Sequence, residues 1–470
     1  MRTSALQYLY LQKPVSSIIL IVVLSVLPWI WNGLYTVEET QNTEIATAIL
    51  TSGDWILPKT PASETICQPP LSHWLIAAFS LPQGFVSGFT TRLPTVLSFV
   101  VLMVFALLFF GRRLRFQEAF IAVLLLITCV EIHWAGISAN INMIYTMFMS
   151  IGLFKMYRWE NKLELKRLPL IIPLMFSGAI LTKGISGIIH PLLIFGCYLF
   201  FLRKYSFYKI IKSLFYVGLT SLFIPSIWYI EGWRQGASDF LHVAFSEDIT
   251  HLIGINNFQT ASHLLLSPII GFLPWTLLLF CSLFGLSRSD FSPTNLIEND
   301  EEEMKTRKKM RLFCFIASIG FVFLIFLSGN TTSSDFLPAY PFLAIFMAQY
   351  IIYLTENHSY VTRIFAGILA TAVLIIILIT SLESTRLIDL SAWISRYLSE
   401  NNVNSFHSIM TAISFNNMAF VTLFLLLLIA LGTTYYQMSK KINIKILYAT
   451  IFLIYCCYLF VDGVIINHVL

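Results

Sequence analysis

The chain has 470 residues, of which 57% are hydrophobic and 12% are charged, with a formal net charge of +5 at pH 7. Soluble domains carry about twice that charged fraction, so the composition excludes a soluble globule and predicts a polytopic membrane protein. Basic cytoplasmic loops account for the positive charge, so nucleic acid is not an expected partner. Of seven cysteines, six lie in apolar runs and none forms a CxxC pair, which predicts neither a disulfide framework nor a zinc site.

Apolar runs of roughly 20 residues recur along the chain, and each is long enough to cross about 30 Å of hydrocarbon as a helix. The first run, residues 15–34, follows Arg2 and Lys13 and lacks a small-x-small cleavage site. It is therefore predicted to be a retained span with a cytoplasmic N-terminus.

Lys and Arg positions predict the topology, because short loops rich in these residues stay in the cytoplasm. All but six of the 30 Lys and Arg fall on one predicted side; the exceptions are Lys59, Arg92, Lys183, Arg234, Arg386 and Arg396. We predict thirteen spans with an outer C-terminus: the first run, then 92–111, 117–134, 139–157, 169–182, 185–202, 209–230, 261–286, 311–328, 337–354, 361–381, 413–436 and 444–466.

Residues 71–81 are predicted to lie along the outer interface, because only one crossing fits between the first span and the basic cluster that starts at Arg112. The alternative, with 71–86 and 92–111 both spanning, would place three arginines outside. The cytoplasmic segment 287–310 is predicted to be a solvated charged loop without chemistry.

The first predicted outer loop, residues 34–91, is acidic. Residues 43–50 have apolar side chains at helical spacing, and Gly53 follows as a predicted C-cap. Glu38 and Glu39 would then lie just upstream of the first turn. The helix dipole favours carboxylates there, so a purely structural explanation stands beside a functional one.

The second predicted outer loop, residues 231–260, has a spacing of aromatic and polar residues that predicts an interfacial helix with one polar side. His73, Glu247 and His251 would form a proton relay or a metal group if they converge. Satisfied packing of a lone histidine is the alternative.

Six fragments occur in a characteristic order: EETQNTEIATAILTSGDWILPK, QPPLSHWLIAA, TTRLPTVLS, LTKGISG, GFLPW and FLPAYPFLA. Between about residues 30 and 350 the chain therefore resembles the GT-C membrane glycosyltransferases, in particular the lipid A aminoarabinose transferases and the protein O-mannosyltransferases. The resemblance implies an all-α membrane fold of about thirteen spans, with interfacial helices in the outer loops. It also implies an outer cavity in which a sugar leaves a polyprenyl-phosphate donor.

The resemblance implies roles for several residues. Glu38 would be the general base and Glu39 would orient it or help to hold a divalent metal, while Lys183 and Arg92 would bind the donor phosphate. The expected cavity and acceptor residues are His73, Gln68, Asn142, Glu247 and His251.

The chain also departs from the family pattern. Cys67 and Gln68 stand where relatives have Glu-Lys, Asn142 replaces an aspartate, and residues 328–331 lack the expected cation. A metal held by the usual acid pair is therefore doubtful, because Cys67 and Gln68 do not replace a hard oxygen anion.

Residues 1–381 are predicted to form the catalytic core, and residues 382–470 an outer amphipathic segment with two further spans. The predicted function is glycosyl transfer, with inversion, from a polyprenyl-phosphate sugar to a lipid, glycan or protein acceptor at the periplasmic face of a bacterial inner membrane. Membrane lipids are further expected partners. One alternative is an inactive GT-C subunit that binds lipid-linked sugar or assembles a complex. Another is a glycan transporter, which the lack of paired broken helices disfavours.

Overall fold

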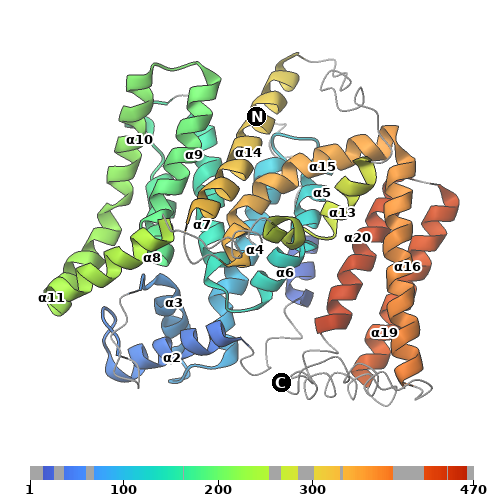
Figure 1. Ribbon diagram of the computed structural model, residues 1–470, viewed down its shortest axis with the longest axis horizontal. Coiled ribbons are helices and arrows are strands. Elements are labelled where there is room, and N and C mark those ends of the chain that lie inside the picture. Colours follow the sequence, from blue (N-terminus) through green and yellow to red (C-terminus); the bar gives the residue numbers. More distant parts are fainter. Residues whose placement is uncertain are drawn as a thin grey trace. The chain divides into compact units, whose positions relative to one another are not determined.

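The computed structural model describes residues 14–25, 36–59, 68–161, 163–252, 266–283, 301–328, 332–384, 418–441 and 443–462, and these are mainly helical (Figure 1). Two compact units are present. The first takes its described residues from Met1–Val22, Thr36–Leu273 and Leu296–Ala348, and the second from Val23–Tyr35, Pro274–Asn295 and Gln349–Leu470. One boundary between the units falls within a helix near residue 348, and the predicted functional division after residue 381 stays a prediction.

Six described helical segments are long and apolar enough to cross a membrane, and the number rises to eight if each of two bent pairs is one span. The six are α4 (Gly88–Phe110), the Thr306–Leu327 part of α14 (Glu301–Leu327), the 3-10 helix η4 (Ser333–Ala339) with α15 (Tyr340–Asn357), α16 (Ser359–Ser384), α19 (Met418–Lys440) and α20 (Asn443–Phe460). The bent pairs are α5 (Phe116–Ile127) with α6 (Val130–Ile137), and α10 (Phe207–Ser221) with the start of α11 (Phe223–Leu252). The protein is thus an all-helical, multi-pass membrane protein, and the count of thirteen spans stays a prediction.

The shorter helices lie close to their predicted positions. They are α3 (Leu71–Ser80), α7 (Ile141–Trp159), α8 (Ile171–Lys183) and α9 (Ser186–Leu202). The helix predicted within the second outer loop is present, but it is the continuation of α11, which runs without a break to Leu252; its interfacial position stays a prediction.

Helix α2 (Val37–Ser52) begins earlier than predicted, because Thr36 caps it. The Thr36 hydroxyl accepts from the Glu39 amide and the Glu39 carboxylate accepts from the Thr36 amide, which is a capping box. Glu38 and Glu39 therefore lie inside the first turn. At the other end Gly53 has a φ of 71°, which confirms the predicted C-cap.

The predicted solvated loop 287–310 is wrong from Glu301 onward, where α14 begins. Arg307 on this helix is buried and donates through Nη1 to the Glu118 carboxylate of α5 at 3.2 Å. Lys309 pairs with the fully buried Glu160 at the end of α7. These charges lie next to the apolar part of α14, so their pairing replaces the water that they would otherwise lose.

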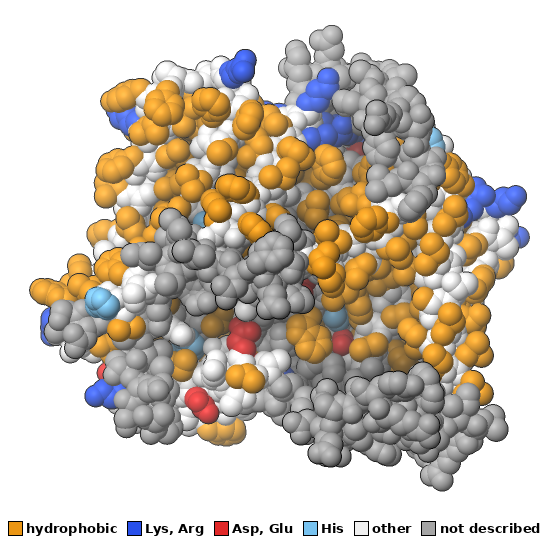
Figure 2. Space-filling view, in the orientation of Figure 1, with side chains coloured by type: hydrophobic (Ala, Val, Ile, Leu, Met, Phe, Trp, Pro, Cys, Tyr) orange, Lys and Arg blue, Asp and Glu red, His pale blue; other side chains and the backbone are white. Residues whose placement is uncertain are grey.

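Exposed apolar side chains cover the outer surface of each unit. In the first unit they include Phe207, Phe215 and Leu219 of α10, and in the second Ile364 and Leu378 of α16. Figure 2 shows apolar side chains over the visible sides of α9 and α10, with Lys and Arg at the helix ends. An apolar surface of this kind suits contact with the hydrocarbon core of a lipid bilayer. Inside the second unit, α16, α19 and α20 share an apolar core that contains Ala370, Phe420 and Leu453.

We expect Arg307→Met to lower the stability of the detergent-solubilised protein by about 3–5 kcal/mol, because it leaves the buried Glu118 carboxylate without its guanidinium partner. Thermal unfolding of Arg307→Met, Glu118→Gln and the double variant measures this. The double variant should be more stable than Arg307→Met alone. Additive losses would contradict the pairing.

Candidate functional site

The first turn of α2 contains a buried ion pair. Arg92 of α4 donates to Glu39 through Nε at 2.7 Å and through Nη2 at 3.0 Å, one bond to each carboxylate oxygen. The Ala139 amide, just before α7, adds a third bond at 3.0 Å. Each side chain of the pair is 1% exposed. A bidentate, charge-assisted pair of this kind fixes three segments against one another.

This geometry favours a positioning role for both partners. The guanidinium of Arg92 was expected at the donor phosphate, yet its planar edge faces Glu39 and its side chain is buried. Glu39 was expected to orient the base or to help hold a metal, and both of its oxygens accept from Arg92. Glu39 therefore anchors the first turn of α2, and the predicted role of Glu39 in orienting Glu38 stays a prediction.

Glu38 is more loosely held and half-buried. Its carboxylate accepts from the Ile141 amide at 3.3 Å and from Asn140 Nδ2 at 3.5 Å, both at the start of α7. Burial raises the pKa of Glu38 above its usual value, although the Ile141 bond and the nearby charge of Lys183 act in the opposite direction. Glu38 is thus a partly desolvated carboxylate with long hydrogen bonds.

Lys183 is the last residue of α8, and Gly184 ends the helix with a φ of 66°. Its ammonium donates to Asn142 Oδ1 at 2.7 Å and forms an ion pair with Asp335. The two charged side chains are 22% and 12% exposed. The Lys183 ammonium also lies 5.6 Å from the centre of the Tyr145 ring. Within residues 140–142, Glu38 therefore contacts Asn140 and Ile141, and Lys183 contacts Asn142.

The 3-10 helix η4 joins these parts, because three consecutive residues contact three different helices. Ser333 donates to Glu131 of α6 at 3.1 Å, Ser334 accepts from Asn140 at 3.2 Å, and Asp335 pairs with Lys183 of α8. Thr332 caps η4 by donating its amide to the other oxygen of Asp335 at 2.7 Å. Sequence reasoning missed these residues. The available signal was an acidic residue directly before the FLPAYPFLA fragment.

Other predicted site residues lie elsewhere. His73 is 2% exposed and its Nε2 contacts Asn42 Oδ1 at 3.1 Å, so it packs between α2 and α3. Gln68 is exposed. Glu247 and His251 are on α11, but their side chains, like Cys67 and residues 329–331, lie outside what the structure describes, so their convergence with His73 stays a prediction.

The described residues do not fit a divalent metal. No group of three or more His, Cys, Asp or Glu side chains suited to an ion occurs among them. Glu39, which would have supplied a hard oxygen ligand, is already paired with Arg92. We therefore derive no step that uses a metal.

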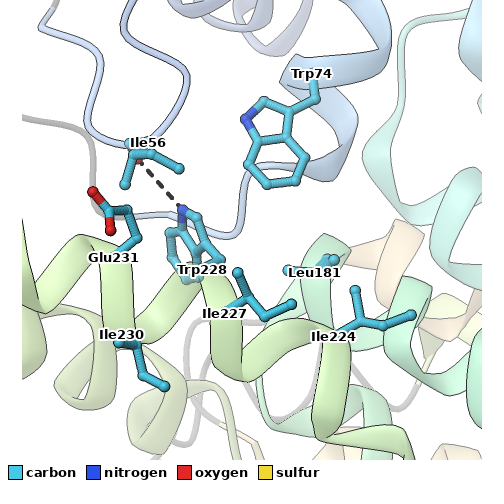
Figure 3. A pocket seen from close by; sticks show the side chains of 8 residues that line it. All are labelled: Ile56, Trp74, Leu181, Ile224, Ile227, Trp228, Ile230 and Glu231. Atoms are coloured by element: carbon cyan, nitrogen blue, oxygen red, sulfur yellow. Dashed lines mark hydrogen bonds between the residues drawn. The ribbon is translucent and has the colours of Figure 1, made fainter.

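An apolar cavity of about 430 Å³ lies beside the end of α8. Figure 3 shows its lining: Ile224, Ile227, Trp228, Ile230 and Glu231 from α11, facing Ile56, Trp74 and Leu181. The indole of Trp228 donates to the Ile56 carbonyl at 3.4 Å, which ties the loop after α2 to α11. Leu181 and Lys183 are two residues apart, so α8 directs them to nearly opposite sides.

The fold defines the class of protein. Over 95% of its length the chain superimposes on 76% of ArnT from Cupriavidus metallidurans bound to undecaprenyl phosphate, with a TM-score of 0.70 at 17% identity. ArnT in the apo state gives a TM-score of 0.69 at 16% identity. This likeness shows a GT-C membrane fold.

Sequence comparison finds a family match over about a third of the chain. Residues 67–229 match the model of the family described as dolichyl-phosphate-mannose-protein mannosyltransferase. Over this part of its length the chain is similar to that family, and it is a distant relative of ArnT, which agrees with the resemblance noted from the fragments.

Two curated relatives match in part. The undecaprenyl phosphate-alpha-4-amino-4-deoxy-L-arabinose arabinosyl transferase of Edwardsiella ictaluri (strain 93-146) is 25% identical over 271 residues, 55% of this chain and 47% of that protein. An uncharacterized protein of Aquifex aeolicus (strain VF5) is 23% identical over 326 residues, 68% of this chain and 60% of that protein. The matches thus span about half to three fifths of these relatives.

Replacing Arg92 by Met should destabilise the protein by about 3–5 kcal/mol, because Glu39 would keep a buried charge without its guanidinium. Glu39→Gln together with Arg92→Met should recover part of that loss. Thermal unfolding in detergent measures both. An Arg92→Met protein that stays as stable as the wild type but loses affinity for lipid phosphate would instead support the phosphate role.

His73 should make stability depend on pH. Burial lowers its pKa from 6.5 to about 4, so the unfolded chain binds a proton between these values and the folded protein does not. The contribution of neutral His73 to the free energy of unfolding is at its full value above pH 6.5 and should fall by about 3 kcal/mol as the pH drops toward 4. Denaturant unfolding from pH 7 to 4 should show a flatter profile for His73→Gln. Equal slopes would contradict this.

Proposed function

We propose that the protein transfers a sugar, with inversion, from a polyprenyl-phosphate donor to an acceptor hydroxyl of a lipid, glycan or protein. The observation that carries the proposal is the convergence of Glu38 and Lys183 on residues 140–142 of α7. Glycosyl transfer from a lipid phosphate needs a base for the acceptor and a cation for the leaving phosphate. These two side chains supply both.

In the proposed reaction the acceptor oxygen attacks the anomeric carbon while its proton passes to the Glu38 carboxylate. The bond between the anomeric carbon and the phosphate oxygen breaks, and the phosphate leaves with the electron pair. Lys183 stabilises the negative charge that develops on that phosphate. The raised pKa of Glu38 suits this role, since a base is most effective when its pKa approaches the working pH.

Two features support a lipid-linked donor. The exposed apolar side chains of α10 and α11 form a surface that suits contact with hydrocarbon, where the isoprenoid chain of such a donor would lie. ArnT, whose fold the chain shares, has been solved with undecaprenyl phosphate. We further propose thirteen spans and a site that faces the periplasm across a bacterial inner membrane, as the Lys and Arg distribution indicates.

The competing function is a GT-C subunit that binds the lipid-linked sugar without transferring it. The Lys183–Asp335 pair favours this alternative, because it compensates the charge that the leaving phosphate needs. Turnover distinguishes the two. A subunit would bind polyprenyl phosphate and release no sugar from it.

We expect Glu38→Gln to lower sugar transfer by about 10²–10⁴-fold with little change in donor binding, because the acceptor proton loses its base. The measurement is transfer by purified protein from a mixture of extracted polyprenyl-phosphate sugars. Glu44→Gln, an exposed carboxylate on the same helix, is the matched control. Equal activity of Glu38→Gln and the wild type would exclude Glu38 as the base.

The pH profile gives a second readout. Only ionised Glu38 accepts a proton, so kcat/KM should fall as the pH drops through its raised pKa, with an acid limb above the usual carboxyl value of 4.5. An acid limb that Glu38→Gln leaves in place would argue against the assignment of Glu38 as the base.

Lys183→Ala should weaken polyprenyl-phosphate binding, whereas Lys59→Ala, which changes an exposed lysine, should not.

A further inference from the structure

The carboxylate of Asp335 forms an ion pair with the ammonium of Lys183, the cation that the proposed reaction requires. An ammonium has three N–H donors, and Lys183 directs one to Asp335 and one to Asn142. A donor phosphate must use the remaining N–H or take the place of Asp335. Either way it meets a lysine whose positive charge is already compensated.

Asp335 is held independently of Lys183. One of its oxygens faces Lys183, and the other accepts from the Thr332 amide at 2.7 Å and from the Thr332 hydroxyl at 3.3 Å. The following four residues of η4, Phe336–Ala339, are buried and include Pro338. When Lys183 turns to another anion, the carboxylate of Asp335 therefore stays where it is.

A fixed carboxylate acts unequally on the two phosphates of the proposed cycle. The donor is a phosphodiester with one negative charge, and the product is a monoester whose second pKa is about 6, so its charge approaches −2 at neutral pH. Repulsion grows with that charge. Asp335 therefore disfavours the product more strongly than the donor.

We propose that Asp335 is an internal competitor for Lys183, which pairs with the lysine between turnovers and drives the polyprenyl-phosphate product off it. The inference rests on the proposed function and adds a step to it. Asp335 touches neither reacting atom, so it is a positioning residue that acts through Lys183. Product release is often the slow step of an enzyme cycle, so a carboxylate that speeds release of the product would raise the turnover rate.

The test measures binding of undecaprenyl phosphate to the full-length protein in nanodiscs of zwitterionic lipid. Asp335→Asn keeps the size of the side chain and removes its charge. It should tighten binding by about 10–100-fold, the range by which one charge within 4–6 Å shifts a neighbouring ionic equilibrium. Steady-state transfer should become slower after a first rapid turnover, and Asp335→Glu should restore wild-type behaviour.

Glu160→Gln is the matched control, because Glu160 is also buried and lysine-paired but lies at the opposite end of α7, about 27 Å from Asn142 along the helix. Its affinity for undecaprenyl phosphate should equal that of the wild type. Thr332→Val removes the hydroxyl bond to Asp335 and tests the same idea if Asp335→Asn fails to fold. It should tighten binding by a smaller factor.

Unchanged or weaker binding by Asp335→Asn, or by Thr332→Val in its place, overturns the inference. If Lys183→Ala then abolishes binding, the proposed function stands without it. If the wild type binds no undecaprenyl phosphate, the proposed function fails and this inference fails with it.

Discussion

The site depends on the buried pair between Glu39 and Arg92. Its three bonds join the first turn of α2, the first turns of α4 and the residue before α7. Two charges buried to 1% exposure are costly to desolvate, and only good geometry compensates that cost. Because Glu38 directly precedes Glu39 in the chain, this pair also fixes where the half-buried carboxylate of Glu38 meets the start of α7. The acid pair thus divides into a buried anchor, Glu39, and a half-buried carboxylate, Glu38, that is held by long hydrogen bonds.

The second constraint comes from η4, which is far from α2 in sequence. Ser333, Ser334 and Asp335 reach α6, α7 and α8 in turn, so a segment of three residues sets the relative positions of Glu131, Asn140 and Lys183. The Thr332 cap and the buried side chains after it make η4 rigid. The polar network around Lys183 is therefore built on a capped helical segment.

Much of the fold could be predicted from the sequence, because it follows from local patterns. Apolar runs located α4, α7, α8 and α9, and the Gly53 cap followed from one residue type at one position. The spacing of aromatic and polar residues predicted a helix after residue 230, but its continuity with the preceding apolar segment was missed, because the polar residues there resemble a break when hydropathy is read. A capping residue, Thr36, moved the start of α2 by about two turns.

The site was harder to predict, because its contacts join residues that are distant in sequence. Asp335 is 152 positions from Lys183, and Arg92 is 53 from Glu39. Family resemblance pointed to Lys183, Arg92 and the acid pair, but a motif gives residue types without their partners, so the pairing of Arg92 with Glu39 was not predicted. The partners follow from charge balance, because a buried cation in a low-dielectric site is expected to have a carboxylate beside it. Arg92 and Lys183 each have a carboxylate beside them, so an arriving phosphate would have to compete with groups that the protein already holds.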